Sequence, residues 1–175
     1  VAAGVVPGIG DHIQWNRKLD GRLAQAVMSV PSIKAVEIGD GFAQASRRGS
    51  TVHDEIHYDK SRPGLGFFRK TNRAGGLEGG LTNGENIVVR AAAKPLSTLN
   101  HPLKSVDIRT KKDAVAFVER SDICSVPAAA VVCEAMVALT LADAYLEMFG
   151  GGALTDVRER FDQYVSRLDR FGGGE

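Results

Sequence analysis

Residues 128–148 form a long apolar stretch, and this stretch constrains the possible fold more than any other part of the chain. Its charged residues are Glu134, Asp143 and Glu147. Pro127 stands immediately before it, and proline suits the first turn of a helix because its φ is fixed and it has no backbone N–H. We expect a helix that is buried on most of its sides. The stretch is long enough to cross a bilayer, but its many alanines and its acids favour a core helix with no membrane partner.

An arginine and a carboxylate, Arg120 and Asp122, precede this helix. Charged side chains at the end of a buried helix cost free energy unless they are paired or bind a ligand. These two residues are therefore the first candidates for a functional site. The alternative is a surface salt bridge in which Ser121 or Asp122 caps the helix, and the residues alone leave it open.

The composition bounds the class of protein. The chain has 175 residues, 43% of them hydrophobic and 25% charged, which suits one well-packed soluble domain. A net charge of +1 gives no general attraction to nucleic acid. Cys124 and Cys133 are interpreted as reduced thiols, and no signal peptide is visible, so we expect a cytoplasmic protein. Because the chain begins at Val1, in an apparent strand, we expect it to be part of a longer protein.

Hydrophobic periodicity and turn residues predict the order of elements. We expect strands at residues 1–6, 33–38, 87–93, 106–108 and 114–118, and helices at residues 16–29, 128–148 and 154–170. Residues 54–70 lack a sustained period and are predicted to be a mobile surface loop. This order indicates an α+β fold with an antiparallel β-sheet packed on helices.

Two segments have the residue types of an anion or cofactor site. Residues 73–84 are rich in glycine but fit neither the P-loop nor the dinucleotide fingerprint, so a ligand loop and ordinary turns stay equally open. The segment Lys94-Pro95-Leu96-Ser97-Thr98 offers an ammonium and two hydroxyls at a strand end, which favours phosphate binding over a capped loop.

The histidines do not form a metal site in this sequence. Two of them, His53 and His57, are four residues apart but lie in a loop-like segment. The others are His12 and His101, and neither has ligand spacing. We therefore expect no bound metal.

Four motifs together carry a resemblance to a known family. They are Val36-Glu37-Ile38-Gly39-Asp40-Gly41-Phe42, Thr71-Asn72-Arg73-Ala74-Gly75-Gly76-Leu77-Glu78-Gly79-Gly80, Val89-Arg90-Ala91-Ala92-Ala93-Lys94-Pro95-Leu96-Ser97-Thr98, and Arg120-Ser121-Asp122-Ile123-Cys124-Ser125-Val126-Pro127. In this order and spacing they resemble chorismate synthase over essentially the whole chain, and members from Actinobacteria look closest. Family members are about twice as long, so residues 1–175 resemble the C-terminal portion of a single domain.

The resemblance implies an enzyme, a carbon–oxygen lyase. It would convert 5-enolpyruvylshikimate-3-phosphate to chorismate by 1,4-anti elimination of phosphate, the last common step of aromatic amino-acid biosynthesis. It implies reduced FMN as cofactor, although the reaction has no net redox change, and it associates the chain with NADP. It further implies a homotetramer whose helical core lies between antiparallel sheets, so that this chain is half of a β-α-β sandwich.

Site residues are carried over from the matching motifs. The implied FMN contacts are Pro31, Ser32, Gly79, Lys94, Pro95, Leu96, Ser97, Thr98 and Arg120. Asp122 matches a carboxylate proposed to act with flavin N5 in proton removal, and Arg120 would lie near the substrate, so these two are the catalytic candidates. The family's acid/base histidines match none of the histidines here, so the chain alone is expected to be inactive. A non-catalytic flavin- or nucleotide-binding module, or an oligomerisation module, is the alternative.

Overall fold

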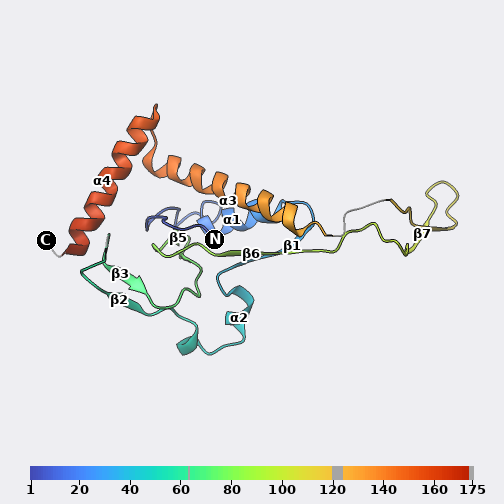
Figure 1. The fold of residues 1–175 in the computed structure, drawn as a ribbon, viewed down its shortest axis with the longest axis horizontal. Coiled ribbons are helices and arrows are strands. Elements are labelled where there is room, and N and C mark those ends of the chain that lie inside the picture. Colours follow the sequence, from blue (N-terminus) through green and yellow to red (C-terminus); the bar gives the residue numbers. More distant parts are fainter. Residues whose placement is uncertain (63, 120–123, 174–175) are drawn as a thin grey trace.

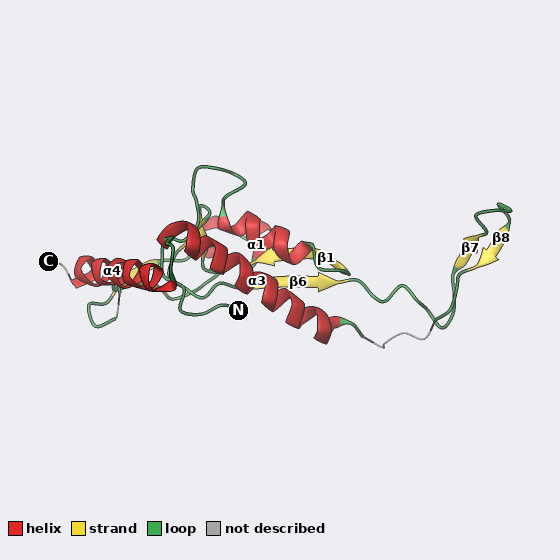
Figure 2. Cartoon of the chain, turned by 90° about the horizontal axis from the view of Figure 1, so that it is seen from above, coloured by secondary structure: helices red, strands yellow, loops and turns green. Residues whose placement is uncertain are grey.

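The computed structural model describes residues 1–62, 64–119 and 124–173. Its centre is an antiparallel pair of strands, β1 (Ile33–Ile38) and β6 (Val89–Ala93), with Ile33 opposite Ala93 and Ile38 opposite Val89. Helices α1 (Leu19–Met28) and α3 (Val126–Phe149) lie side by side on one face of this pair (Figures 1 and 2). The α+β arrangement of antiparallel strands packed on helices is thus confirmed.

Shorter elements surround this centre. They are α2 (Gly41–Ala45), the 3-10 helix η1 (Gly49–Thr51), β2 (Ile56–Tyr58), β3 (Phe67–Arg69), β4 (Leu77–Glu78), β5 (Leu81–Thr82), β7 (Lys104–Val106), β8 (Asp113–Val115) and α4 (Leu154–Gly173). The strands pair antiparallel as β2 with β3, β4 with β5, and β7 with β8. The predicted strand at 33–38 and the helices at 16–29 and 154–170 agree with β1, α1 and α4 to within a few residues at each end.

The core forms where α1 meets the glycine-rich strands and the end of α3. Leu19, Leu23 and Val27 repeat at helical spacing on α1 and are buried. Full burial of one such side chain stabilises the fold by about 1.5–3 kcal/mol. These α1 residues pack with Ile9 and Ile87, which are also fully buried.

A polar side chain is built into this core. Thr82 on β5 is only 4% exposed. Its hydroxyl accepts a hydrogen bond from the N–H of Ile9 at 2.9 Å and donates one to the carbonyl of Val6 at 2.6 Å. Because both groups of the N-terminal segment are satisfied by Thr82, this segment docks without joining a sheet.

Helix α3 differs from the prediction of a helix buried on most sides. All of α3 lies in the described part of the chain, and within it only Leu141, Ala144 and Phe149 are buried. The physical reason is that α1 packs on one side of α3 and α4 contacts it at one end, which leaves the opposite side in solvent (Figure 2). By length and hydropathy α3 also resembles a membrane-spanning helix, as the sequence indicated.

An ion-pair cluster fixes α1 against α3. Arg22 on α1 donates hydrogen bonds to Glu147, at 2.8 Å, and to Asp143. The Arg22 side chain is 14% exposed, whereas those of Asp143 and Glu147 are 67% and 42% exposed, so solvent screens the cluster from the side of the acids. Two of the acids of the apolar stretch therefore have a structural function.

Residues 54–70, which were predicted to be a mobile surface loop without regular structure, contain two strands. Strands β2 and β3 form a hairpin in which the rings of Tyr58 and Phe67 lie 5.1 Å apart. This hairpin meets the C-terminal end of α4, since the Tyr58 hydroxyl donates to the Gly172 carbonyl at 2.5 Å and the Gly64 N–H donates to Asp169 at 2.8 Å. Contacts with α4, more than a hundred residues later in the chain, hold this hairpin in place, and no local sequence pattern predicts them.

Three further strand predictions are wrong in detail. Residues 1–6 make only an isolated bridge, Ala2 with Ile87, because Gly4 adopts a φ of 76° that interrupts the extended backbone. The strands predicted at 106–108 and 114–118 are displaced to β7 and β8. The Asp107 carboxylate accepts hydrogen bonds from the N–H and hydroxyl of Thr110, which makes a turn where a strand was expected.

The β7–β8 hairpin stands at the end of a long arm that projects from the body (Figures 1 and 2). The N–H of Ala116 bonds to the carbonyl of Leu103 at 3.0 Å and extends the pairing toward the base of the arm. Within the described residues, β7 and β8 pair only with each other. The arm leaves the body after β6 and returns to the start of α3.

Candidate functional site

The ends of β1 and β6 bring together two of the predicted cofactor segments. Antiparallel pairing places Ser32, just before β1, opposite Lys94, just after β6. The N–H of Lys94 donates to the carbonyl of Ser32 at 2.8 Å. Ser32 has a φ of 73°, an uncommon conformation for a residue with a side chain. The structure therefore joins the Pro31-Ser32 turn and the Lys94 segment at one end of the strand pair.

A groove adjoins this junction. Its volume is about 620 Å³, and it lies between the strand pair and the N-terminal half of α3. Ile33 and Ala93, the strand residues next to the junction, line it together with Val126 at the start of α3. Its remaining walls are almost entirely apolar, with Glu134 as the charged exception. The start of α3 thus lies near the Ser32–Lys94 junction.

The N-terminus of α3 has the electrostatic character of an anion site. Ser125 occupies the cap position, and in the described structure its side chain makes no cap hydrogen bond. The first backbone N–H groups of a helix lack intrahelical partners and carry partial positive charge. Lys94 and Ser97 are exposed on the arm that leaves the same junction. An ammonium, a hydroxyl and helix N–H groups are donors that suit a phosphate.

The other predicted site residues are distributed unevenly. Pro31 is exposed beside Ser32, and Pro95, Leu96 and Thr98 continue along the arm. Arg120 and Asp122 lie outside the described residues. Gly79, in the β4–β5 turn, lies apart from the Ser32–Lys94 junction. The carbonyl of the adjacent Gly80 accepts a hydrogen bond from the N–H of Leu19, at the start of α1, whereas Ser32 follows the end of α1. A helix of ten residues spans about 15 Å.

A second cluster joins two of the sequence motifs at the opposite end of the strand pair. The N–H of Asp40 donates to the carbonyl of Arg73 at 2.8 Å, and the Gln44 side chain donates to the same carbonyl. Arg90 donates to the Gly39 carbonyl. Gly75, with a φ of 67°, has no room for a Cβ because the backbone of Gly39 occupies that space. This close approach explains why glycine stands at positions 39 and 75.

Asp54 organises that cluster, and the sequence analysis did not find it. Its carboxylate accepts hydrogen bonds from the N–H groups of Arg73 and Ala74, at 3.0 and 2.9 Å, and from the Thr71 hydroxyl. Desolvation raises the pKa of Asp54, but the hydrogen bonds from Ala74, Thr71 and Arg73 outweigh it, so the pKa lies below its ordinary value. No local pattern marks this residue, because its partners follow about twenty positions later.

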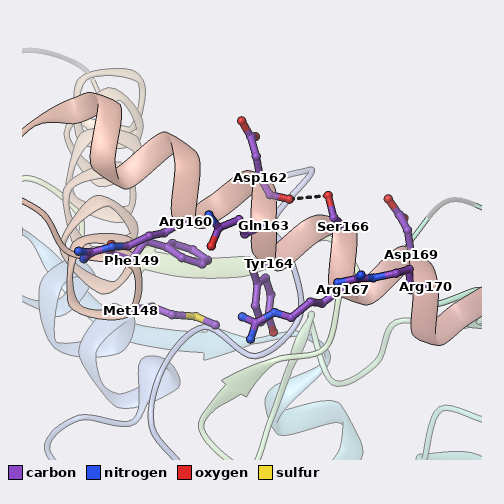
Figure 3. Close-up of a pocket in the computed structure, with 10 residues that line it drawn as sticks. All are labelled: Met148, Phe149, Arg160, Asp162, Gln163, Tyr164, Ser166, Arg167, Asp169 and Arg170. Carbon is purple, nitrogen blue, oxygen red and sulfur yellow. Dashed lines mark hydrogen bonds between the residues drawn. The ribbon is translucent and has the colours of Figure 1, made fainter.

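A hollow lies between the end of α3 and α4 (Figure 3). It has a volume of about 990 Å³ and is lined by Met148, Phe149 and one side of α4. Arg160 reaches back to the carbonyls of Phe149 and Gly150 and so caps α3. Burial raises the pKa of Tyr164, whose hydroxyl donates to the Pro7 carbonyl at 2.8 Å. These contacts hold α4 in place, at the opposite end of α3 from the Ser32–Lys94 junction.

The described residues contain no group of three or more histidine, cysteine or acidic side chains arranged to hold a metal ion. The donors near the Ser32–Lys94 junction are instead an ammonium, a hydroxyl and backbone groups. This donor set suits an anionic organic ligand.

Comparison with known proteins relates both the fold and the sequence of this chain to one family. The fold is that of an α+β protein, and a solved "Crystal Structure of Chorismate Synthase" matches 97% of this chain, with a TM-score of 0.77 and 48% identity, over 42% of its own length. The family model described as chorismate synthase matches residues 1–146. The chain therefore belongs to the chorismate synthase family.

Curated relatives agree with this assignment. The chorismate synthase of Geobacter metallireducens is 58% identical over 98% of this chain, and that of Moorella thermoacetica is 60% identical over 96%. The chain spans 44% and 43% of the lengths of these two proteins. It thus spans less than half of the curated relatives that it matches.

Proposed function

We propose that this chain is the C-terminal portion, residues 1–175, of a chorismate synthase domain. The complete enzyme would eliminate phosphate from 5-enolpyruvylshikimate-3-phosphate to give chorismate. The observation that carries the proposal is the junction of Ser32 with Lys94 beside the start of α3, within a chain of this family. It gathers donors for a phosphate next to an apolar groove.

The donor set fits FMN as the cofactor. Lys94, Ser97 and Thr98 would hold the FMN phosphate, because an ammonium and hydroxyls donate to its oxygens. Pro31, Ser32, Pro95 and Leu96 would contact the rest of the cofactor, largely through the backbone. When bound in its reduced form, FMN supplies electron density to the substrate as phosphate departs. Gly79, which lies apart from this junction, would contribute from another side.

The chemistry of elimination assigns separate roles to Asp122 and Arg120. Loss of phosphate requires that a proton leave the substrate, and we assign Asp122 to accept or relay that proton on its carboxylate. Arg120 would bind the departing phosphate, whose charge grows as its carbon–oxygen bond breaks. The acid/base histidines would come from the portion of the relatives that this chain does not span.

The same proposal extends to the assembled protein. We place the complete enzyme in the cytoplasm as a homotetramer that uses reduced FMN and is associated with NADP. What supports this is the family membership.

The test is chorismate formation from 5-enolpyruvylshikimate-3-phosphate with reduced FMN under anaerobic conditions. The 175-residue chain is assayed alone and after mixing with the separately produced remainder of a relative. We expect no turnover alone and turnover on mixing. Failure of the folded mixture to form chorismate contradicts the proposal.

A second candidate is a flavin- or nucleotide-binding module without chemistry, favoured by the small share of the relatives that the chain spans. It predicts that FMN fluorescence is quenched by this chain alone, with an affinity that the remainder does not change. The chorismate synthase proposal predicts instead that binding strengthens when the remainder is added.

A further inference from the structure

Arg69, the last residue of β3, connects the β2–β3 hairpin to the glycine-rich motif. Its guanidinium lies 2.5 Å from the Glu78 carboxylate on β4, and its backbone N–H donates a hydrogen bond to the Glu85 side chain at 2.8 Å. The Arg69 side chain is 12% exposed and that of Glu78 is 45% exposed, so solvent reaches this pair from the side of the acid. One residue thus contacts the chain on both sides of β5.

The contacts of Arg69 form part of a closed network. The Glu78 carboxylate also accepts a hydrogen bond from the Asn83 side chain at 2.9 Å. The Asn83 side-chain oxygen in turn accepts one from the N–H of Glu85 at 3.0 Å, and the Glu85 side chain accepts from Arg69. Because each member is held by two others, the network fixes the orientation of Glu78 more firmly than a single surface ion pair would.

The residue that follows Glu78 is Gly79, which we assign to the cofactor. Gly79 and Gly80 form the turn between β4 and β5, and Gly79 is exposed. In the described structure, no atom beyond its chain neighbours lies within 4 Å of the place that a Cβ of Gly79 would take, so a ligand can approach its backbone. On the other side of the turn, the Gly80 carbonyl accepts from the N–H of Leu19 at 2.9 Å. Arg69 and α1 therefore hold the Gly79 turn from its two sides.

Arg69 has a cost that stability alone does not explain. Its Nε atom is buried and has no hydrogen-bond partner among the residues that the structure describes. A buried donor without a partner disfavours folding, and an apolar side chain of similar length would avoid this cost. The arginine is therefore better explained by what it holds in place, which is Glu78 beside Gly79.

Helix α4 holds the hairpin that carries Arg69, and Figure 1 shows the hairpin near the C-terminal end of this helix. The Tyr58 hydroxyl donates to the Gly172 carbonyl at 2.5 Å, and the N–H of Gly64 donates to Asp169 at 2.8 Å. Gly172 is buried, and a Cβ at this position would collide with the Gly64 carbonyl oxygen. A glycine is therefore needed for the helix to approach the hairpin this closely.

We propose that Arg69 is a positioning residue for the cofactor site: it holds the Gly79 turn in place for contact with the flavin, and α4 supports it by holding the β2–β3 hairpin. This inference rests on the proposed function. Arg69 does not itself touch the cofactor and acts through Glu78. The inference gives residues 54–70 and α4 a shared role, which is to fix one side of the flavin site.

Turnover of the mixture of this chain with the remainder of a relative, measured against the concentration of reduced FMN, tests the inference. We expect Arg69→Met to raise the FMN concentration for half-maximal turnover about tenfold and to leave kcat at saturating FMN unchanged, because a displaced turn weakens cofactor binding only. A merely structural loss lowers the amount of active enzyme, and so lowers kcat at an unchanged half-saturating concentration. The matched control is Arg62→Met, since Arg62 belongs to the same hairpin but stacks on Phe68, 3.7 Å from the ring centroid.

The outcomes separate this inference from the proposed function. If the unchanged chain and the remainder are folded and form no chorismate, the proposed function fails and the inference fails with it. If the unchanged mixture turns over, and Arg69→Met either has the half-saturating concentration of the unchanged chain or loses kcat alone, only the inference is wrong. Arg69→Lys keeps a charge for Glu78 and should return the half-saturating concentration to within about threefold of the unchanged chain.

A second variant approaches the same ion pair from the opposite side. Glu78→Gln leaves the hairpin unaltered and decides the matter where Arg69→Met fails to fold, as judged by circular dichroism. It should raise the half-saturating FMN concentration about as much as Arg69→Met does, and the double variant should be no weaker than either single one, because both remove one interaction. Effects that add in the double variant contradict an action through Glu78.

The support from α4 has its own test. In Gly172→Ala the added Cβ meets the Gly64 carbonyl and moves α4 away from the hairpin. We expect the half-saturating FMN concentration to rise at least about threefold. Gly173→Ala is the matched control, because nothing in the described part of the chain lies within 4 Å of a Cβ at that position. Equal values for the two variants contradict the role of α4.

Discussion

A single buried hydroxyl, that of Thr82, connects the N-terminal segment to the core, and its contribution is measurable. Thr82→Val keeps the shape but leaves the Ile9 N–H and the Val6 carbonyl without their partner. We expect the free energy of unfolding to fall by about 1–3 kcal/mol. Thr82→Ser keeps the hydroxyl and should cost less, about 0.8 kcal/mol for the lost carbon. Urea denaturation of both variants decides, and a larger loss for serine than for valine contradicts this account.

The lowered pKa of Asp54 makes stability depend on pH. Since the folded pKa lies below the unfolded one, the unfolded chain binds more protons, and stability rises with pH through this range. The contribution is complete above about pH 5, beyond the unfolded pKa of about 3.9, and is lost as pH falls through the folded pKa. We expect Asp54→Asn to lower unfolding free energy by roughly 1 kcal/mol at pH 7, allowing for solvent screening, and by less at pH 3. Thermal unfolding at both pH values measures this, and an equal loss at both refutes it.

At the scale of elements, the packing of α1 on α3 depends on Arg22. Arg22→Met keeps the apolar stem but removes the bonds to Asp143 and Glu147, which then repel each other one turn apart. We expect a loss of about 1–2 kcal/mol in unfolding free energy.

The control for Arg22→Met is Arg17→Met. Arg17 is 55% exposed, and its ion pairs with Asp11 and Glu147 are 3.5 and 4.0 Å long. Urea denaturation should show little change for this variant. Equal losses for the two variants would mean that the Arg22 cluster has no special contribution.

The local sequence pattern was sufficient to predict the helices and strands that have a clear hydrophobic pattern of their own. The apolar residues in 33–38, the apolar run at 87–93 and the spacing of Leu19, Leu23 and Val27 predict β1, β6 and α1. Ser32 meets Lys94 because β1 and β6 pair antiparallel in the register that sets Ile33 opposite Ala93, and the sequence alone did not predict this register. The β2–β3 hairpin and Asp54 could not be predicted, because their partners lie far along the chain. The burial of α3 was overestimated, because apolar composition shows that a surface needs covering but not whether this chain covers it.

For the whole molecule, the proposed cofactor site gives a direct test. In the mixture of this chain with the remainder of a relative, Lys94→Ala should weaken FMN binding about tenfold or more, because a phosphate would lose a charged donor. Lys104→Ala, at the distant β7 strand, is the matched control and should bind FMN normally. Titration of FMN fluorescence measures both, and equal affinities for Lys94→Ala and the unchanged chain contradict the assignment.

The projecting arm has a mechanical consequence. Its outgoing side begins at Lys94, directly after β6, and its returning side is described as far as residue 119. The hydrogen bond from the Ala116 N–H to the Leu103 carbonyl joins the two sides. Because of this bond, we expect a displacement of the β7–β8 hairpin to move both sides of the arm together. A partner that held the hairpin would therefore also restrain the Lys94 segment, to which we assign the cofactor.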